Sequence, residues 1–260
     1  MLNYVTKKQK QKSYHFHSTT LKNTDTNANL NPSRENLMEN SLSEETHWEK
    51  AAKTRMGKYL TKMETCFIFN TVNMAKTHMV MDVGAEAGRF SLLVAKNTID
   101  VIGIDTDSYG LKRLKLKNKL VDVIQADARK MPLKDEIFDA ILMIEVVDYI
   151  PEIEMTLTEC YRTLKSEAPI ILSFGNKSSL KSELRKLRGK SYHHSFQKVT
   201  QSLHKTGFKI TKKMGYNWLP FGRTSENPLI PFLARIERFF GLRRIPSLSP
   251  WVIVHAVKLN

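Results

Sequence analysis

Cysteine is scarce in this chain, and the two cysteines that occur do not form a metal-binding pair. Cys66 and Cys160 are the only cysteines among 260 residues. Their low number excludes a disulfide-stapled secreted scaffold, and their spacing excludes a zinc site of the CxxC type. They favour a reducing compartment, in which we expect both thiols to pack as small hydrophobic side chains.

Long apolar runs are absent as well. No stretch reaches the roughly 18 apolar residues that a membrane-spanning helix needs. The N-terminal stretch MLNYVTKKQKQKSYHFHSTT is basic and polar, and no apolar segment of signal-peptide length follows it. This pattern argues against export by a cleaved signal. We therefore expect a cytoplasmic protein, with peripheral contact to a membrane as the alternative.

Acidic residues are fewer than basic residues. The chain has 41 Lys and Arg residues against 26 Asp and Glu, which gives a net charge of +15. Such an excess favours an anionic partner, whether nucleic acid, an acidic membrane surface or a phosphorylated substrate. The positive residues gather in four clusters, at residues 7–12, 112–119, 181–190 and 235–244. Each cluster is explained equally well by a solvated face.

The first segment of the chain differs in composition from the rest. Residues 1–42 are rich in Asn, Ser, Thr and Lys, so we expect a disordered basic tail that cannot bury enough apolar surface to fold. We assign residues 43–260 to one domain. Ser43 and Thr46 are start signals for a helix over residues 47–75, whose candidate packing residues are Trp48, Met56, Tyr59, Leu60, Met63, Phe67 and Phe69.

From residue 79 onward, short apolar runs alternate with helical stretches. The pattern predicts strands over residues 79–83, 100–105, 121–126, 138–144, 168–174, 208–216 and 251–259. Helices are predicted over 88–97, 108–120 and 151–165, the last opening with Pro151. This alternation predicts an α/β fold with a doubly wound, seven-stranded, mostly parallel, Rossmann-like sheet. Residues 217–250 are too many for a hairpin loop, and we expect a helical insertion that forms a lid.

The stretch MDVGAEAGRF at residues 81–90 is the strongest signal for a ligand-binding site. A strand runs into a turn with two glycines, Gly84 and Gly88, and a helix opens behind it, so a ligand can approach free backbone N–H groups. Asp105 ends the next strand, where a carboxylate can accept hydrogen bonds from ribose hydroxyls. The third strand ends in QADA, which places Asp127 where its carboxylate could accept from an adenine amino group.

The residues around this turn favour a cationic cofactor over a dinucleotide. Gly84 and Gly88 do not have the GxGxxG spacing of dinucleotide binders. Asp82 and Glu86 add negative charge, which disfavours a pyrophosphate and favours a ligand that carries positively charged groups.

The runs DVGAEAGRF, VIGIDTD and QADARKMPLKDEIFDAILMIEVVDYI resemble, in order and spacing, the core of class I S-adenosylmethionine-dependent methyltransferases. The ubiquinone/menaquinone-type subgroup is the most similar, and the strong resemblance covers residues 79–174. It implies methyl transfer, with S-adenosylmethionine as the cofactor. It also implies a set of cofactor-binding residues, namely Asp82, Gly84, Ala85, Gly88, Asp105, Thr106, Asp127, Ala128, Ile144 and Glu145.

The resemblance gives most of these residues a role. Asp82 and the glycine turn surround the methionine portion, Asp105 holds the ribose, and Asp127 with Ala128 faces the adenine. Ile144 and Glu145 lie beside the sulfonium, close to the acceptor. One departure stands out, because Glu86 occupies a position where the family usually has glycine and where a side chain is strained or crowds the cofactor.

The acceptor is not identified by the sequence, and no residue is assigned as a catalytic base. Asp148 and Tyr149 follow the fourth strand, where acceptor contacts occur in the family. No metal site is predicted, because the pair His193 and His194 lacks a third ligand, although His194 is a candidate for the acceptor site. Residues 229–244 form a basic amphipathic stretch that either lies on an anionic membrane or packs as a lid with its arginines outward.

Three hypotheses about function follow. The first is a methyltransferase for a small-molecule acceptor, such as a lipid-linked or saccharide one. The second is an RNA or protein methyltransferase, which the charge suggests. Nucleic acid is less favoured, because EVVD stands at residues 145–148 in place of an Asn/Asp-Pro-Pro-Tyr motif. The third is a non-catalytic scaffold that retains the fold, which Glu86 would support.

Overall fold

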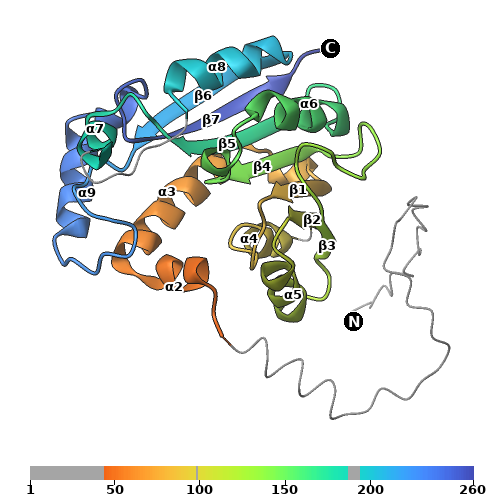
Figure 1. Cartoon of the computed structure of the whole chain (residues 1–260), viewed down its shortest axis with the longest axis horizontal. Helices are drawn as coiled ribbons and strands as arrows, with labels where there is room; N and C mark the ends of the chain where they lie inside the picture. The colour runs from red at the N-terminus through yellow and green to blue at the C-terminus, as the bar shows by residue number, and fades with distance from the viewer. Residues whose placement is uncertain (1–43, 98, 187–193) are drawn as a thin grey trace, which may run out of the picture.

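A seven-stranded sheet forms the centre of the computed structural model, which describes residues 44–97, 99–186 and 194–260 (Figure 1). The strand order is β3-β2-β1-β4-β5-β7-β6, and β7 runs antiparallel to both of its neighbours. The α/β fold with a mostly parallel sheet is therefore confirmed. The strands are β1 (Met79–Val83), β2 (Asp100–Asp105), β3 (Asp122–Gln125), β4 (Ala140–Ile144), β5 (Pro169–Gly175), β6 (Phe208–Tyr216) and β7 (Trp251–Lys258).

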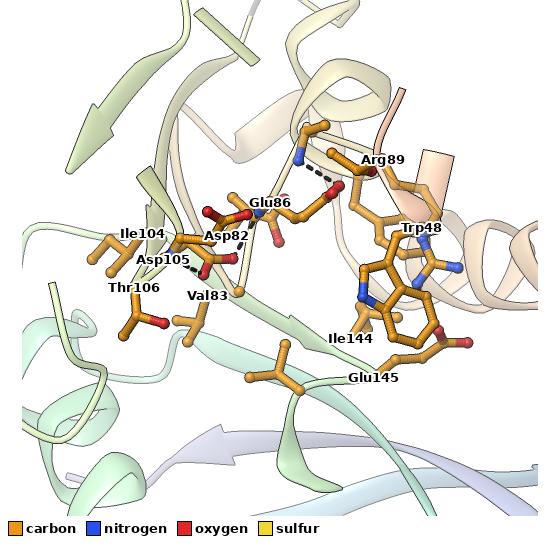
Figure 2. Close-up of a pocket in the computed structure, with 18 of the residues that line it drawn as sticks. Trp48, Asp82, Val83, Glu86, Arg89, Ile104, Asp105, Thr106, Ile144 and Glu145 are labelled. Carbon is orange, nitrogen blue, oxygen red and sulfur yellow. Dashed lines mark hydrogen bonds and ion pairs between the residues drawn. The ribbon is translucent and has the colours of Figure 1, made fainter. Parts of the chain in front are cut away.

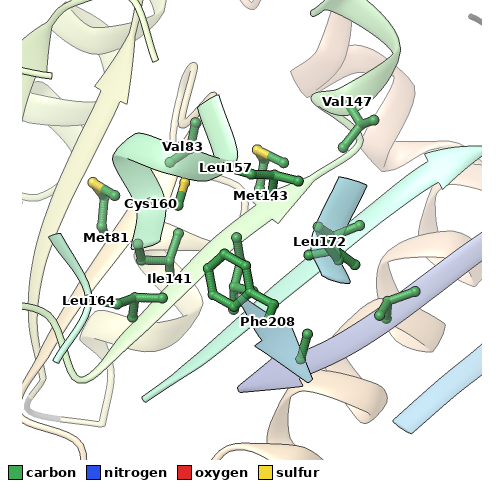
Figure 3. Packing of buried hydrophobic residues seen from close by; sticks show 14 of the residues in the cluster. Met81, Val83, Ile141, Met143, Val147, Leu157, Cys160, Leu164, Leu172 and Phe208 are labelled. Carbon is green, nitrogen blue, oxygen red and sulfur yellow. The ribbon is translucent and has the colours of Figure 1, made fainter. Parts of the chain in front are cut away.

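Two helical layers cover the sheet. On one face, α6 (Ile153–Thr163) and α8 (Phe196–Lys205) pack over a core in which Leu157 and Cys160 lie against Ile141 and Met143 (Figure 3). On the other face lie α3 (Arg55–Thr71), α4 (Ser91–Ala95) and α5 (Ser108–Lys117), packed against alternate strand residues such as Leu142. Because both faces of the sheet are buried, the central strands are continuous apolar runs. For this reason their ranges could be predicted from the sequence.

The helical boundaries depart from the sequence prediction, most clearly in three places. The predicted helix 47–75 is split at Thr54, whose extended backbone separates α2 (His47–Lys53) from α3 and whose side chain caps α3. The glycine turn occupies residues 84–90, so α4 begins only at Ser91. Pro151 lies outside α6, which begins at Ile153 after Glu152. Sequence reasoning assigned no element to α7 (Leu180–Lys186) or α8.

The two cysteines have different surroundings. Cys160 is buried in the core as predicted, whereas Cys66 is exposed and that prediction is wrong. The reason is helical periodicity, because the buried side of α3 carries Leu60, Glu64, Phe67 and Ile68, and Cys66 lies on the opposite side. The predicted tail at 1–42 and His193 lie outside the described residues.

The segment between β6 and β7, residues 217–250, contains α9 (Ile230–Phe239) and the short helix η3 (Leu242–Arg244). It is joined to α2 and α3 by hydrogen bonds rather than lying apart. The Thr54 hydroxyl donates to the Arg223 carbonyl at 2.9 Å, and the Met56 N–H donates to the Ser225 carbonyl at 3.1 Å. Two 3-10 turns complete the fold, η1 (Met74–Lys76) and η2 (Val147–Tyr149). Within the described residues, no helix is long and apolar enough to cross a bilayer.

Candidate cofactor site

A cavity of about 1110 Å³ opens where β1, β2, β3 and β4 end. The strand order reverses between β1 and β4, and open α/β sheets bind ligands at such a switch point. The structure brings all ten predicted cofactor-binding residues to the wall of this cavity: Asp82, Gly84, Ala85, Gly88, Asp105, Thr106, Asp127, Ala128, Ile144 and Glu145.

The glycine turn needs both of its glycines. Gly84 and Gly88 have φ values of 72° and 87°, in the left-handed region that disfavours side chains. A Cβ at Gly84 would lie 2.2 Å from Val146, and one at Gly88 would lie 2.2 Å from Leu114. The Gly84 N–H also donates to the Ile104 carbonyl at 2.7 Å, which fixes the turn against the end of β2.

Glu86 is accommodated in the turn at the cost of an unusual backbone conformation. Its φ is 46°, so a glutamate occupies the conformation that glycine adopts most readily. Its carboxylate accepts the Ala87 N–H at 2.6 Å, and its own N–H donates to Asp105 Oδ2 at 2.9 Å (Figure 2). Glu86 therefore forms part of the cavity wall and helps to orient Asp105.

Asp105 is held at the end of β2 by two backbone groups. Oδ2 accepts from Glu86, and Oδ1 accepts the Asp107 N–H at 2.9 Å. A carboxylate offers about four lone-pair sites, so roughly two stay available to a ligand. Thr106 follows at the cavity edge, where its carbonyl accepts from the Gln125 side chain at 3.1 Å.

Asp82 and Asp127, two of the three remaining predicted acids, have protein partners that the sequence did not reveal. Asp82 is buried and accepts the Ser91 hydroxyl at 2.5 Å, and burial raises the pKa of Asp82 to about 6. The Asp127 carboxylate accepts from the Arg129 guanidinium at 2.7 Å, and this hydrogen bonding lowers the pKa of Asp127. Arg129 also pairs with Glu152, so Asp127 belongs to a surface charge network as well as to the cavity wall.

Glu145 belongs to a buried cluster of charges that sequence reasoning missed. Its carboxylate pairs with Arg89 at 3.1 Å and also with Arg223. Arg89 reaches Glu64 at 3.4 Å, and the Tyr216 hydroxyl donates to Glu64 at 2.7 Å. Burial, reinforced by the charge of Glu145, raises the pKa of Glu64 to about 8. Burial also acts to raise the pKa of Glu145, but the two guanidinium groups outweigh it and lower that pKa.

Aromatic side chains line the end of the cavity near Glu145. Figure 2 shows Trp48 and Glu145 at one end and Asp105 with Thr106 at the other. Trp48 was expected to be a packing residue, but it lines the cavity, edge-to-face with Tyr149 at 6.3 Å between ring centroids. The Arg223 guanidinium lies 5.2 Å from the centroid of the Trp48 ring. Helical spacing could not reveal this pairing, because Arg223 comes from the distant insertion.

Two other candidate acceptor residues do not line the cavity. The Asp148 carboxylate accepts the Gly175 N–H at 2.9 Å, and His194 is buried with its Nε2 2.8 Å from the Ile150 carbonyl oxygen. Tyr149, the third candidate acceptor residue, does line the cavity. Across the described ranges, no three His, Cys, Asp or Glu side chains are placed to hold a metal ion.

The cavity differs in charge from the rest of the chain. Five basic residues line it, namely Lys53, Lys58, Arg89, Lys117 and Arg129. Eight acidic residues do so, namely Glu45, Glu49, Asp82, Glu86, Asp105, Asp107, Asp127 and Glu145. In a chain with a net charge of +15, an excess of carboxylates at the switch point favours a cationic ligand.

The sheet order, the glycine turn and the acid at the end of β2 define the fold of the class I, S-adenosylmethionine-dependent methyltransferases. Residues 81–172 match the family of methyltransferase domains. The chain thus contains a methyltransferase domain, and the family predicted from the sequence is confirmed.

Several known proteins are similar to this chain, and they cover it to different extents. Sterol methyltransferase-like 1 of Botryococcus braunii is 34% identical over 113 residues, which are 41% of this chain and 29% of the relative. A methyltransferase structure from Listeria monocytogenes has a TM-score of 0.58 at 16% identity, covering 77% of this chain and 98% of the other. N-methyltransferase NodS of Bradyrhizobium japonicum WM9, solved with S-adenosyl-L-homocysteine, has a TM-score of 0.59 at 11% identity, covering 86% and 98%.

Proposed function

We propose that this chain transfers a methyl group from S-adenosylmethionine to a small, apolar or lipid-linked acceptor. The observation that carries the proposal is the excess of carboxylates around a cavity at the switch point of a strongly basic chain. Such a site suits the ammonium and sulfonium of S-adenosylmethionine and repels a dinucleotide or a nucleic-acid backbone. NodS, which has the same fold, was solved with the demethylated product of this cofactor.

The residues that line the cavity support one orientation of the cofactor. Asp105 would accept from the ribose hydroxyls through the lone pairs that Glu86 and Asp107 leave unused. Gly84 and the turn behind it would surround the methionine portion, and Asp127 with Ala128 would face the adenine. Ile144 and Glu145 would then lie beside the reactive end. When bound, the cofactor supplies an electrophilic methyl group.

The chain's own contribution is positioning and exclusion of water. Helix α2 lines the cavity and is held against α5 by Glu49, whose carboxylate pairs with Arg113 at 2.6 Å and with Lys117 at 2.5 Å. Burial acts to raise the pKa of Glu49, but hydrogen bonds from these two cations lower it to about 2. Glu49 therefore stays ionised at neutral pH and keeps α2 in place.

The acceptor end combines aromatic surface with the buried ion pairs of Glu145. Trp48 and Tyr149 line it in edge-to-face contact. Glu145 is a poor proton acceptor because two arginines stabilise its ionised form, so the site suits an acceptor that needs little help from a base. The relative named sterol methyltransferase-like 1 agrees with an acceptor of this apolar class.

Calorimetric titration tests the cofactor. The purified chain is titrated with S-adenosylmethionine and with S-adenosylhomocysteine, beside the variants Asp105→Ala and Asp122→Ala. We expect both ligands to bind and Asp105→Ala to weaken binding by about 30-fold or more, since two charge-assisted hydrogen bonds are lost. The control residue Asp122 is an exposed acid at the start of β3, outside the cavity wall, and its removal should leave binding unchanged.

The same titration separates the alternatives. Absence of heat with either ligand would contradict the proposal, and binding that appears only in Glu86→Gly would identify a non-catalytic scaffold. For a chain that binds, transfer of a labelled methyl group is followed into lipid, RNA and protein fractions of a cell extract. Label in the lipid fraction supports the proposed acceptor class, whereas label in RNA or protein contradicts it.

A further inference from the structure

Helix α9 has apolar side chains on both of its sides, because Ile230 is buried and Leu233 packs against the core on the inner side. Glu237 is 1% exposed on its inner side, where its carboxylate accepts from the Tyr59 hydroxyl at 2.7 Å and pairs with Arg243 at 3.0 Å. Phe232 and Phe239 lie two turns apart on the outer side, 60% and 84% exposed. The inner side already packs on the domain through Ile230 and Leu233, so the two exposed phenylalanines are not explained by the role of a lid.

Positive charge accompanies these aromatic side chains. Arg235 and Arg238 are exposed on α9, and neither forms an ion pair with a carboxylate in the described part of the chain. Exposed apolar side chains continue the patch at both ends of the helix, with Leu229 before it and Phe240 after it. We call these six residues the α9 surface: Leu229, Phe232, Arg235, Arg238, Phe239 and Phe240.

We propose that the α9 surface docks on an anionic lipid bilayer. A helix that combines exposed phenylalanine and leucine with arginine lies in the interface of a membrane, where its apolar side chains enter the acyl boundary and its arginines meet lipid phosphates. Symmetric pairing with a second copy would bring the same unpaired arginines together. Leu229 adds an aliphatic side chain, which the acyl boundary of a bilayer accepts and which base stacking does not use.

The α9 surface is connected to the acceptor end of the cavity. Figure 1 shows α9 on the outside of the molecule, beyond α3. The same insertion carries Arg223, which pairs with Glu145 inside the cavity and stacks over Trp48. If the proposed function holds, docking through α9 brings the aromatic end of the cavity close to a lipid acceptor. The docking itself does not depend on methyl transfer.

Sedimentation with vesicles tests the proposal on the full chain. Vesicles of phosphatidylcholine alone are compared with an equimolar mixture of phosphatidylcholine and phosphatidylglycerol. We expect the chain to pellet with the mixed vesicles, and less so as salt is raised. The double variant Phe232→Ser/Phe239→Ser should lower the partition coefficient by about tenfold or more. Arg235→Gln/Arg238→Gln should lower it by about tenfold on mixed vesicles.

The matched control is Leu120→Ser, which removes an apolar side chain that is 89% exposed outside the α9 surface. It should leave vesicle binding unchanged, and circular dichroism should show that every variant is folded.

The proposal is overturned if mixed vesicles fail to bind the chain or if the phenylalanine variant binds them as well as the unmodified chain. It is also overturned if that variant instead abolishes a dimer in sedimentation velocity or binding to single-stranded RNA. None of these results depends on the cofactor.

Discussion

Arg223 pairs with Glu145 across 78 positions of the sequence, and this ion pair joins the insertion between β6 and β7 to the end of β4. Both side chains are largely buried, with 15% of Arg223 and 5% of Glu145 exposed. A buried charge without a partner destabilises a protein by several kcal/mol. The pair therefore fixes where the insertion lies relative to the cavity.

We expect Arg223→Gln to lower the free energy of unfolding by about 2 kcal/mol, less than the full penalty for an unpaired buried charge because Arg89 still faces Glu145. Urea denaturation measures the change. Arg223→Gln/Glu145→Gln should recover at least half of the loss, since the carboxylate of Glu145 is gone and Arg89 keeps Glu64 as a partner. Arg244→Gln, an exposed arginine in the same insertion, should be neutral. Equal stability of Arg223→Gln and the unmodified chain would show that the pair does not hold the insertion.

The strands and the cofactor turn were predictable because their signals are local. β1 and β2 coincide with the predicted ranges, since strands buried on both faces are continuous apolar runs. Gly84 and Asp105 end neighbouring parallel strands, and that order along the chain is enough to place them at one edge of the sheet. All ten residues expected around the cofactor lie in one cavity for this reason.

The acceptor end was not predictable, because it is assembled from distant segments. Trp48, Arg89 and Arg223 come from α2, the glycine turn and the insertion, and no spacing links them. The amphipathic pattern of α9 showed that a helix was present but not which side faces inward. Ile230 and Leu233 pack on the core, and Glu237 can be buried beside them because it has Tyr59 and Arg243 as partners.

Replacement of Glu86 by glycine should stabilise the fold. Glu86 has a φ of 46°, a conformation that costs a non-glycine residue roughly 1 kcal/mol. Loss of its hydrogen bond to the Ala87 N–H offsets part of that gain, so we expect a net increase in unfolding free energy of about 0.5 kcal/mol, measured by urea denaturation. Glu167→Gly, at a left-handed and exposed position, should stabilise similarly without changing cofactor affinity. A loss of stability in Glu86→Gly alone would mean that its side chain contributes more than the strain costs.

Replacement of Gly57 by alanine should destabilise the chain, although alanine is the better helix former by about 1 kcal/mol. A Cβ at Gly57 would lie 1.9 Å from the Ala51 carbonyl oxygen, because α3 begins directly behind the break at Thr54. We expect a net loss of about 2 kcal/mol in thermal or urea unfolding, since backbone must move to relieve the contact. Gly222→Ala, where no atom lies within 4 Å of the added Cβ, is the neutral control. Stabilisation by Gly57→Ala would mean that α2 and α3 form one continuous helix.

The buried carboxyl of Glu64 should make stability fall as pH rises. Burial, together with the charge of Glu145, raises the pKa of Glu64 from 4.5 to about 8 in the folded chain. Between these values the unfolded chain has released a proton that the folded chain retains. The free energy of unfolding therefore decreases with pH by up to about 1.4 kcal/mol per pH unit, and the effect is complete above the folded pKa.

Urea denaturation across the range from about pH 5 to about pH 8 measures this slope. Glu64→Gln, whose side-chain carbonyl can still accept from the Tyr216 hydroxyl, should flatten it. Asp82, whose pKa is raised from 3.8 to about 6, contributes a slope of the same sign in both proteins, but only at the acidic end of this range. The exposed Glu167→Gln should reproduce the slope of the unmodified chain. Equal slopes in Glu64→Gln and the unmodified chain would mean that Glu64 is ionised in the folded protein. Arg89 would then serve as the counter-charge of both Glu64 and Glu145.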